Sequence, residues 1–134
     1  MSTMNFGNIG SFIAGEALKS FCVVKLKSTS ERTVEYADAG ESGDMIGVTL
    51  EAAADGADVP VLLWGSSTSV KMRASSAVTS FAVNDLVILA NDGKISRYVA
   101  STTARVTIGR IMEIPTAEEA VVQVYPLPLT SRGL

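Results

Sequence analysis

The chain contains an internal repeat. The segment from Ser20 to Trp64 returns, with substitutions, as Ser80 to Tyr125, so that Ser20-Phe21 aligns with Ser80-Phe81. The clearest anchor runs from Ile46 to Glu51 and returns as Ile108 to Glu113. An apolar alternation follows each anchor, at Val59, Val61 and Leu63 in the first copy and at Val122, Val124 and Pro126 in the second. One such unit alone cannot cover its apolar face, so we expect two β units that complete a common core.

Short runs of β-branched and aromatic residues, separated by turn residues, predict strands rather than helices along the whole chain. The predicted strands are residues 21–26, 33–36, 45–50, 59–64 and 70–74, followed by a hairpin within 86–98. The hairpin turn is placed at Asn91-Asp92-Gly93, because Asp and Gly tolerate the positive φ of a tight turn. We therefore expect an all-β fold, a compact β-barrel or β-sandwich. It would occupy residues 14–134, with repeat copies at about 17–65 and 77–126.

Residues 1–13 are expected to form an extended N-terminal arm outside this domain. Gly7 and Gly10 disfavour a helix, and the apolar side chains Phe6, Ile9 and Phe12, which these glycines separate, need a surface that the arm itself cannot supply. A frayed terminus is the alternative. The residues expected to bind a partner through this arm are Met4, Asn5, Phe6, Ile9 and Phe12.

The C-terminal tail, Pro126-Leu127-Pro128-Leu129, should lie extended against the body of the protein or against a neighbour. Only 19% of the 134 residues are charged while 47% are hydrophobic, which leaves little polar side-chain material to cover a small globule. We therefore expect a homo-oligomer or a large docking face. The candidates for an oligomer interface are Trp64, Leu127 and Leu129.

The charge distribution argues against a nucleic-acid partner, since the net charge is -3 and the eleven Lys and Arg residues are scattered. No apolar run approaches the 18 or so residues that a membrane helix needs, and the N-terminus lacks the pattern of a signal peptide. We therefore expect no membrane partner and a soluble protein synthesised in the cytoplasm.

Catalytic chemistry has few candidates, because the chain contains no histidine and a single cysteine, Cys22. Ser-His-Asp and Cys-His nucleophiles are excluded, and Cys22 is expected to be a small core residue. A Ser-Lys hydrolase built on Ser69 and Lys71 remains the enzyme alternative, although alternation places both on one exposed face with Arg73. Glu51 and Glu113 occupy matching repeat positions, which duplication alone explains.

No cofactor or metal site is expected. The acidic loop over residues 38–44 lacks the ligand spacing of a calcium loop, and the chain has no Gly-Lys-Ser phosphate loop. We therefore expect a protein that is not an enzyme.

Four motifs follow one another in the first copy: Ala14-Gly15-Glu16-Ala17, Val24-Lys25-Leu26, the block from Ile46 to Gly56, and the strand from Val59 to Leu63. Their order and spacing resemble those of the capsid cement or head decoration proteins of tailed bacteriophages. The resemblance covers residues 14–65 well and the second copy more weakly. The fuller second copy and the proline-rich tail depart from the compact single repeat of many family members.

The resemblance implies a β-barrel or β-sandwich protomer in a homotrimer, seated where capsomers meet on the outer surface of the virion. Its partner would be the major capsid protein, and its role would be to cement an expanded shell against the pressure of packaged DNA. The arm would add a strand to a sheet edge of the capsid protein. A phage tail or baseplate adaptor, which would share the β architecture, is the alternative.

Overall fold

The computed structural model describes residues 9–65, 69–75, 81–99 and 105–132, with side chains as far as residue 128. These residues form ten strands and no α-helix, so the expected all-β fold is confirmed. The strands are β1 (Ile9–Ala14), β2 (Val23–Leu26), β3 (Thr33–Tyr36), β4 (Met45–Thr49), β5 (Asp58–Leu63), β6 (Val70–Arg73), β7 (Leu86–Leu89), β8 (Ile95–Arg97), β9 (Arg105–Ile111) and β10 (Val121–Arg132). Two single 3-10 turns, η2 (Ser42–Asp44) and η4 (Asn91–Gly93), lie between strands.

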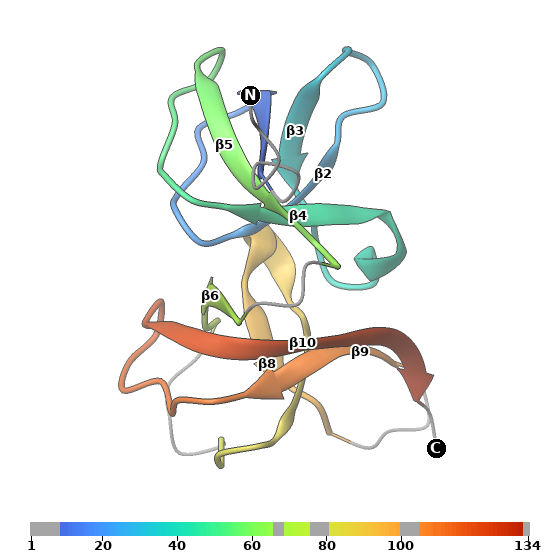
Figure 1. The fold of residues 1–134 in the computed structure, drawn as a ribbon, viewed down its shortest axis with the longest axis vertical. Helices are drawn as coiled ribbons and strands as arrows, with labels where there is room; N and C mark the ends of the chain where they lie inside the picture. Colours follow the sequence, from blue (N-terminus) through green and yellow to red (C-terminus); the bar gives the residue numbers. More distant parts are fainter. Residues whose placement is uncertain (1–8, 66–68, 76–80, 100–104, 133–134) are drawn as a thin grey trace.

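The strands form two stacked units, with the first unit (β1–β5) above the second unit (β6–β10) in Figure 1. The first is a closed barrel in the order β1-β3-β2-β4-β5, and the second is a sheet in the order β6-β10-β9-β7-β8. A parallel pairing of Ala14 with Val34 closes the first barrel, and a parallel bridge between Ala74 and Ile95 occupies the corresponding place in the second. The two halves of the chain therefore have the same topology.

The repeat extends to the irregularities of the strands. In both units the pairing skips one residue beside a glycine of the Ile-Gly anchor, Gly47 in β4 and Gly109 in β9. A β-carbon on Gly47 would overlap the carbonyl oxygen of Leu62, and one on Gly109 would lie 2.6 Å from that of Tyr125. The Ile-Gly anchor thus marks a β-bulge where neighbouring backbones approach too closely for a side chain.

The alignment that pairs Phe21 with Phe81 is wrong by three residues. Phe21 corresponds to Asn84, because both have a positive φ and donate a backbone hydrogen bond to the last residue of equivalent strands, Thr49 of β4 and Ile111 of β9 respectively. Phe81 instead packs in the core between the units. The error arises because the two phenylalanines precede their strands by different distances: β2 begins two residues after Phe21, whereas β7 begins five residues after Phe81.

The expected arm over residues 1–13 is corrected at its C-terminal end. Ile9–Ala14 form β1, which pairs in antiparallel register with β5 from Ile9↔Leu62 to Ile13↔Asp58. β1 is the counterpart of β6, which pairs with β10 in the same way. The segment is extended, as expected, but from residue 9 it belongs to the barrel because it pairs with β5 along almost its whole length.

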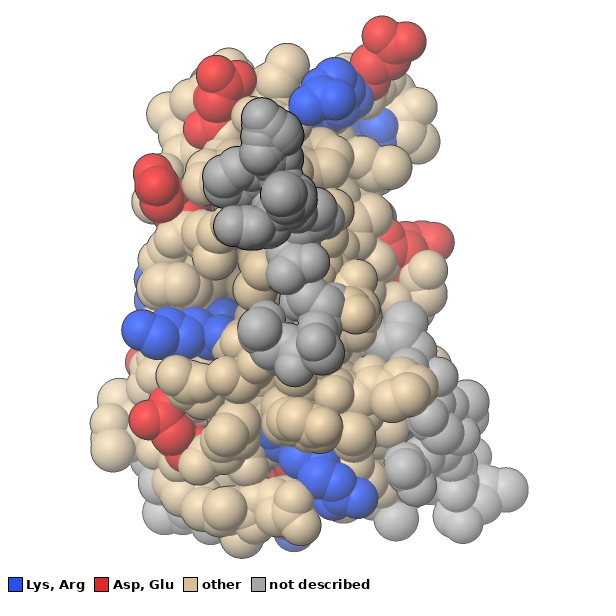
Figure 2. Space-filling view, in the orientation of Figure 1, with Lys and Arg blue, Asp and Glu red and all other residues tan. Residues whose placement is uncertain are grey.

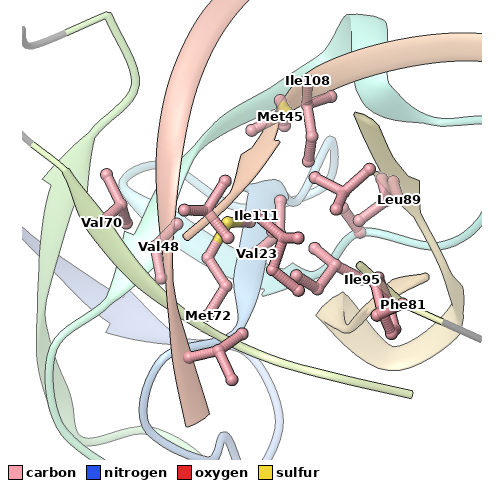
Figure 3. Close-up of a cluster of buried hydrophobic side chains, with 14 residues drawn as sticks. Val23, Met45, Val48, Val70, Met72, Phe81, Leu89, Ile95, Ile108 and Ile111 are labelled. Atoms are coloured by element: carbon pink, nitrogen blue, oxygen red, sulfur yellow. The ribbon is translucent and has the colours of Figure 1, made fainter. Parts of the chain in front are cut away.

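The two units share their largest core. Unit 1 contributes the outer face of its β2–β4 sheet, and unit 2 contributes the inner face of its sheet (Figure 3). The labelled side chains of this cluster include Val23, Met45, Val48, Met72, Leu89, Ile95, Ile108 and Ile111. A smaller cluster fills the first barrel. The first two residues of β2 are consequently buried on opposite faces, Val24 inside the barrel and Val23 against the second unit.

The hairpin turn η4 docks the second unit against the first. Gly93 donates its N–H to the carbonyl oxygen of Ala37 (2.8 Å), and the N–H of Asp92 donates to the carboxylate of Asp38 (2.9 Å). Arg73 adds bonds from its guanidinium to the carbonyl and hydroxyl oxygens of Ser20 (2.8 and 3.1 Å). The predicted turn is confirmed, with φ of 59° at Asp92 and 70° at Gly93.

Candidate interaction surfaces

The single cysteine is a structural side chain. Cys22 is fully buried, and burial raises the pKa of its thiol to about 11, so that almost none of it is thiolate near neutral pH. No cluster of three or more metal-ligating side chains is present in the part of the chain that the structure describes.

The Ser69 and Lys71 pair does not have the geometry of a nucleophile and its base. The Ser69 hydroxyl donates a hydrogen bond to Oε1 of Gln123 (2.7 Å), and both residues of the pair are exposed. The Lys71 ammonium lies 5.8 Å from the centre of the Phe21 ring. A Ser-Lys mechanism needs a buried, desolvated lysine. Ser69 and Lys71 instead lie on a solvent-exposed strand face, as expected.

The duplicated glutamates follow corresponding strand ends, Glu51 after β4 and Glu113 after β9. Glu113 accepts the backbone N–H of Gln123 (2.8 Å), which ties it to the neighbouring strand β10. This is a structural role for a strand-end residue, as duplication predicts.

Three charged residues bridge the two units at the surface. The Glu119 carboxylate accepts hydrogen bonds from Lys19 of the first unit (2.8 Å) and Lys94 of the second (3.2 Å). These bonds lower the pKa of Glu119 below its usual value, and the same contact raises the pKa of Lys19. The cluster is satisfied within the chain and therefore stabilises the junction between the units rather than offering a binding site.

The residues expected to bind partners are spread over the molecule. Met4, Asn5 and Phe6 lie outside the described residues. Ile9 and Phe12 are in β1, where Ile9 is 45% exposed and Phe12 packs against the core of the first barrel.

Of the interface candidates, Trp64 is half-buried and packs against the shared core. Leu127 is half-buried in β10, and Leu129 belongs to the same strand. The tail is therefore extended against the body, as predicted.

An apolar surface that the sequence does not reveal lies on the outer face of the second unit. Val83, Met112 and Tyr125 are 63%, 47% and 52% exposed, and with Asn84 and Arg110 they line an open depression of about 330 Å³. The Arg110 guanidinium is held beside it by the carbonyl oxygen of Asn84 (3.0 Å). Exposed apolar side chains gathered in one place are typical of a protein-binding surface.

A second hollow of about 490 Å³ lies where the units meet, between residues 39–42 of the first unit and strands β7 and β9 of the second. Its lining is half polar, and the Asn91 side chain that borders it accepts the N–H of Ala39 (3.1 Å). It belongs to the junction between the units.

Charge does not define a binding face on the side shown in Figure 2, where basic and acidic side chains stand at separate positions among uncharged residues. Neither sign gathers into a patch there, which is unlike a nucleic-acid interface. None of the described segments forms a helix of the length and apolarity needed to cross a membrane.

No family model matches the chain, and no curated protein matches it. A solved structure with a similar fold is that of the head fiber gp8.5 N base in bacteriophage phi29. The TM-score is 0.68 at 14% identity, and the likeness covers 89% of this chain and 92% of the other. At that identity the likeness shows the fold, both β units included.

Proposed function

We propose that the chain is a structural protein of a tailed-phage virion that binds the outside of the expanded head and cements neighbouring capsomers. The observation that carries this proposal is the fold likeness, over nearly the whole of both chains, to the base of a phage head fibre. A fold alone does not assign a function. The absence of histidine from the sequence and the buried, protonated Cys22 support a structural role independently.

The binding segment in this proposal is residues 1–8, which lead directly into β1. Because β1 is fixed to β5, a segment that precedes it starts from a rigid strand and can add to a sheet edge of the capsid protein. Met4, Asn5 and Phe6 would supply the side-chain contacts, and the exposed side of Ile9 would extend them. Phe12 is committed to the barrel and takes no part.

A homotrimer would present three such segments at once. Linked contacts act at a high effective concentration, so weak binding by each segment adds up to firm attachment across neighbouring capsomers. Trp64, Leu127 and Leu129 remain our candidates for contacts within the trimer.

The test is a binding experiment with empty expanded heads of the phage that encodes the chain. A variant lacking residues 1–8 keeps β1 and should fold, but should no longer sediment with heads. A full-length variant with Met4→Ser and Phe6→Ser should also lose binding, while the matched control with Ser2→Ala and Thr3→Ala should bind as the wild type does. Full decoration by the truncated protein would refute the role of this segment.

Electron micrographs of complete virions in which the chain carries a visible label separate the two virion roles. A cement protein covers the head surface at positions between capsomers, whereas a tail or baseplate adaptor is confined to the tail axis. Labelling on the tail alone would refute the proposal in favour of the adaptor.

A further inference from the structure

The apolar depression of the second unit corresponds, by strand register, to the face through which the first unit binds the second. In the first unit, cross-strand neighbours form a row on the outer face of β2, β4 and β5, and the same row recurs on β7, β9 and β10. The rows are Val23↔Val48↔Leu62 and Leu86↔Arg110↔Tyr125. Cross-strand neighbours share a face of the sheet, so the two rows occupy equivalent surfaces.

The equivalent surfaces differ in what covers them. Val23 and Val48 are fully buried, because the second unit packs on them. Tyr125, at the position of Leu62, is 52% exposed. Val99 is 59% exposed and corresponds to Asp38, whose carboxylate accepts the N–H of Asp92 in the second unit. We define the receiving face as Val83, Val99, Met112 and Tyr125.

The complementary half of this contact is also exposed on the same chain, at the far end of the first unit. In the second unit, Leu89 and Arg73 face the first unit, Leu89 within the shared core and Arg73 bonded to Ser20. The register places Leu26 at the position of Leu89 and Ile13 at that of Arg73. Leu89 is only 4% exposed, whereas Leu26 is 51% and Ile13 is 39% exposed. We define the docking end as Ile13 and Leu26.

We propose that the receiving face of one chain binds the docking end of a second copy of this chain, in the arrangement that joins the two units within each chain. The occupant is a second copy because one chain carries both halves of the contact. Of the eight large apolar side chains that are exposed among the described residues, six lie on the receiving face or the docking end. A surface meant for an unrelated partner would not require its complement on the same molecule.

This contact is head-to-tail, so it closes into a ring if the rotation between copies permits and otherwise continues as a filament. It is weaker than the junction within the chain, because Arg110 stands in the centre of the row where the first unit has Val48. Arg110 does not prevent the contact, because its alkyl chain can be buried while its guanidinium keeps the hydrogen bond to the carbonyl oxygen of Asn84. We therefore expect a weak, reversible association.

The test uses the full chain and analytical ultracentrifugation over a range of micromolar concentrations. Leu26→Lys removes the docking end and Tyr125→Lys removes the receiving face, and each should raise the concentration for half-association at least tenfold. Val121→Lys places the same charge on an exposed apolar residue in neither set and should leave association unchanged. Urea unfolding of each variant, with Leu26→Ser and Tyr125→Ser as milder replacements, checks that the fold is kept.

The decisive measurement is an equimolar mixture of the Leu26→Lys and Tyr125→Lys chains. Each keeps the half that the other has lost, so the mixture should form a species that is larger, by at least one 14.0 kDa chain, than the species that either variant forms alone. The proposal is overturned if the wild type stays monomeric, if either variant associates as the wild type does, or if the mixture forms nothing larger than the separate variants form. Because no capsid is present, these outcomes are independent of the proposed cementing function.

Discussion

Replacement of Gly93 by alanine tests whether the turn η4 holds the two units together. Gly93 has a φ of +70°, and a β-carbon there would lie 2.5 Å from the carbonyl oxygen and 2.9 Å from the nitrogen of Val23. Both atoms belong to the backbone of Val23 in β2, where the residue is fully buried, so they cannot move aside as a flexible side chain does. The substitution must therefore push the hairpin away from the first unit.

The expected cost has two parts. The left-handed backbone conformation costs an alanine about 1–2 kcal/mol relative to glycine. Separating the hairpin from β2 costs about 1–3 kcal/mol, as overpacking of a fitted core does. The sum, about 2–5 kcal/mol, is a large share of the roughly 5–15 kcal/mol that stabilises a typical domain.

Gly40→Ala is the matched control, because Gly40 has a φ of +87° but nothing lies within 4 Å of its added β-carbon. It carries the backbone cost alone. Equilibrium unfolding in urea, with the slope of the transition compared between variants, measures both free energies. The Gly93 variant should be the less stable by about 1–3 kcal/mol. Equal stabilities for the two variants would refute the close approach of this turn to β2.

Two further predictions concern ionisable groups. Glu119→Gln should destabilise the protein at neutral pH. The pKa of Glu119 is lowered in the folded protein, so the stability that its ion pairs contribute is present above about pH 4.5 and is lost as the pH falls through the folded pKa. The urea midpoints of the two proteins should therefore converge in acid, and a constant difference at all pH values would contradict the ion pairs. Cys22 should react with a thiol reagent much more slowly in the native protein than in urea, since burial raises the pKa of its thiol to about 11. Equal rates would show that the Cys22 side chain is not buried.

Strand positions could be predicted from the sequence wherever local alternation and turn chemistry agreed. The strand at 33–36 was predicted with its observed bounds, and the hairpin at Asn91-Asp92-Gly93 follows from residues that tolerate positive φ. The Ile-Gly anchor, at Gly47 and Gly109, is visible in the sequence because it recurs in both copies, whereas its cause, the close approach of a neighbouring strand that only glycine permits, is visible only in the structure.

β1 could not be predicted, because its pairing partners are far away in sequence. Ile9 pairs with Leu62, and closure of the barrel pairs Ala14 with Val34, so nothing near residues 9–14 signals that a strand is needed. The receiving face was hidden for a related reason. Met112 and Tyr125 share a surface only because β9 and β10 pair in this register. In addition, an apolar face of a repeat unit has the same sequence pattern whether or not another unit covers it.

Tandem duplication of a stacking unit explains why such faces exist at all. Two units joined by one junction leave one unit with an unused receiving surface and the other with an unused docking surface. Repeat proteins normally cover such ends with polar residues. Here Arg110, at the position of Val48, follows that rule, while Tyr125 and Leu26 do not. A chain that retained apolar side chains at both ends after duplication is suited to stack against copies of itself.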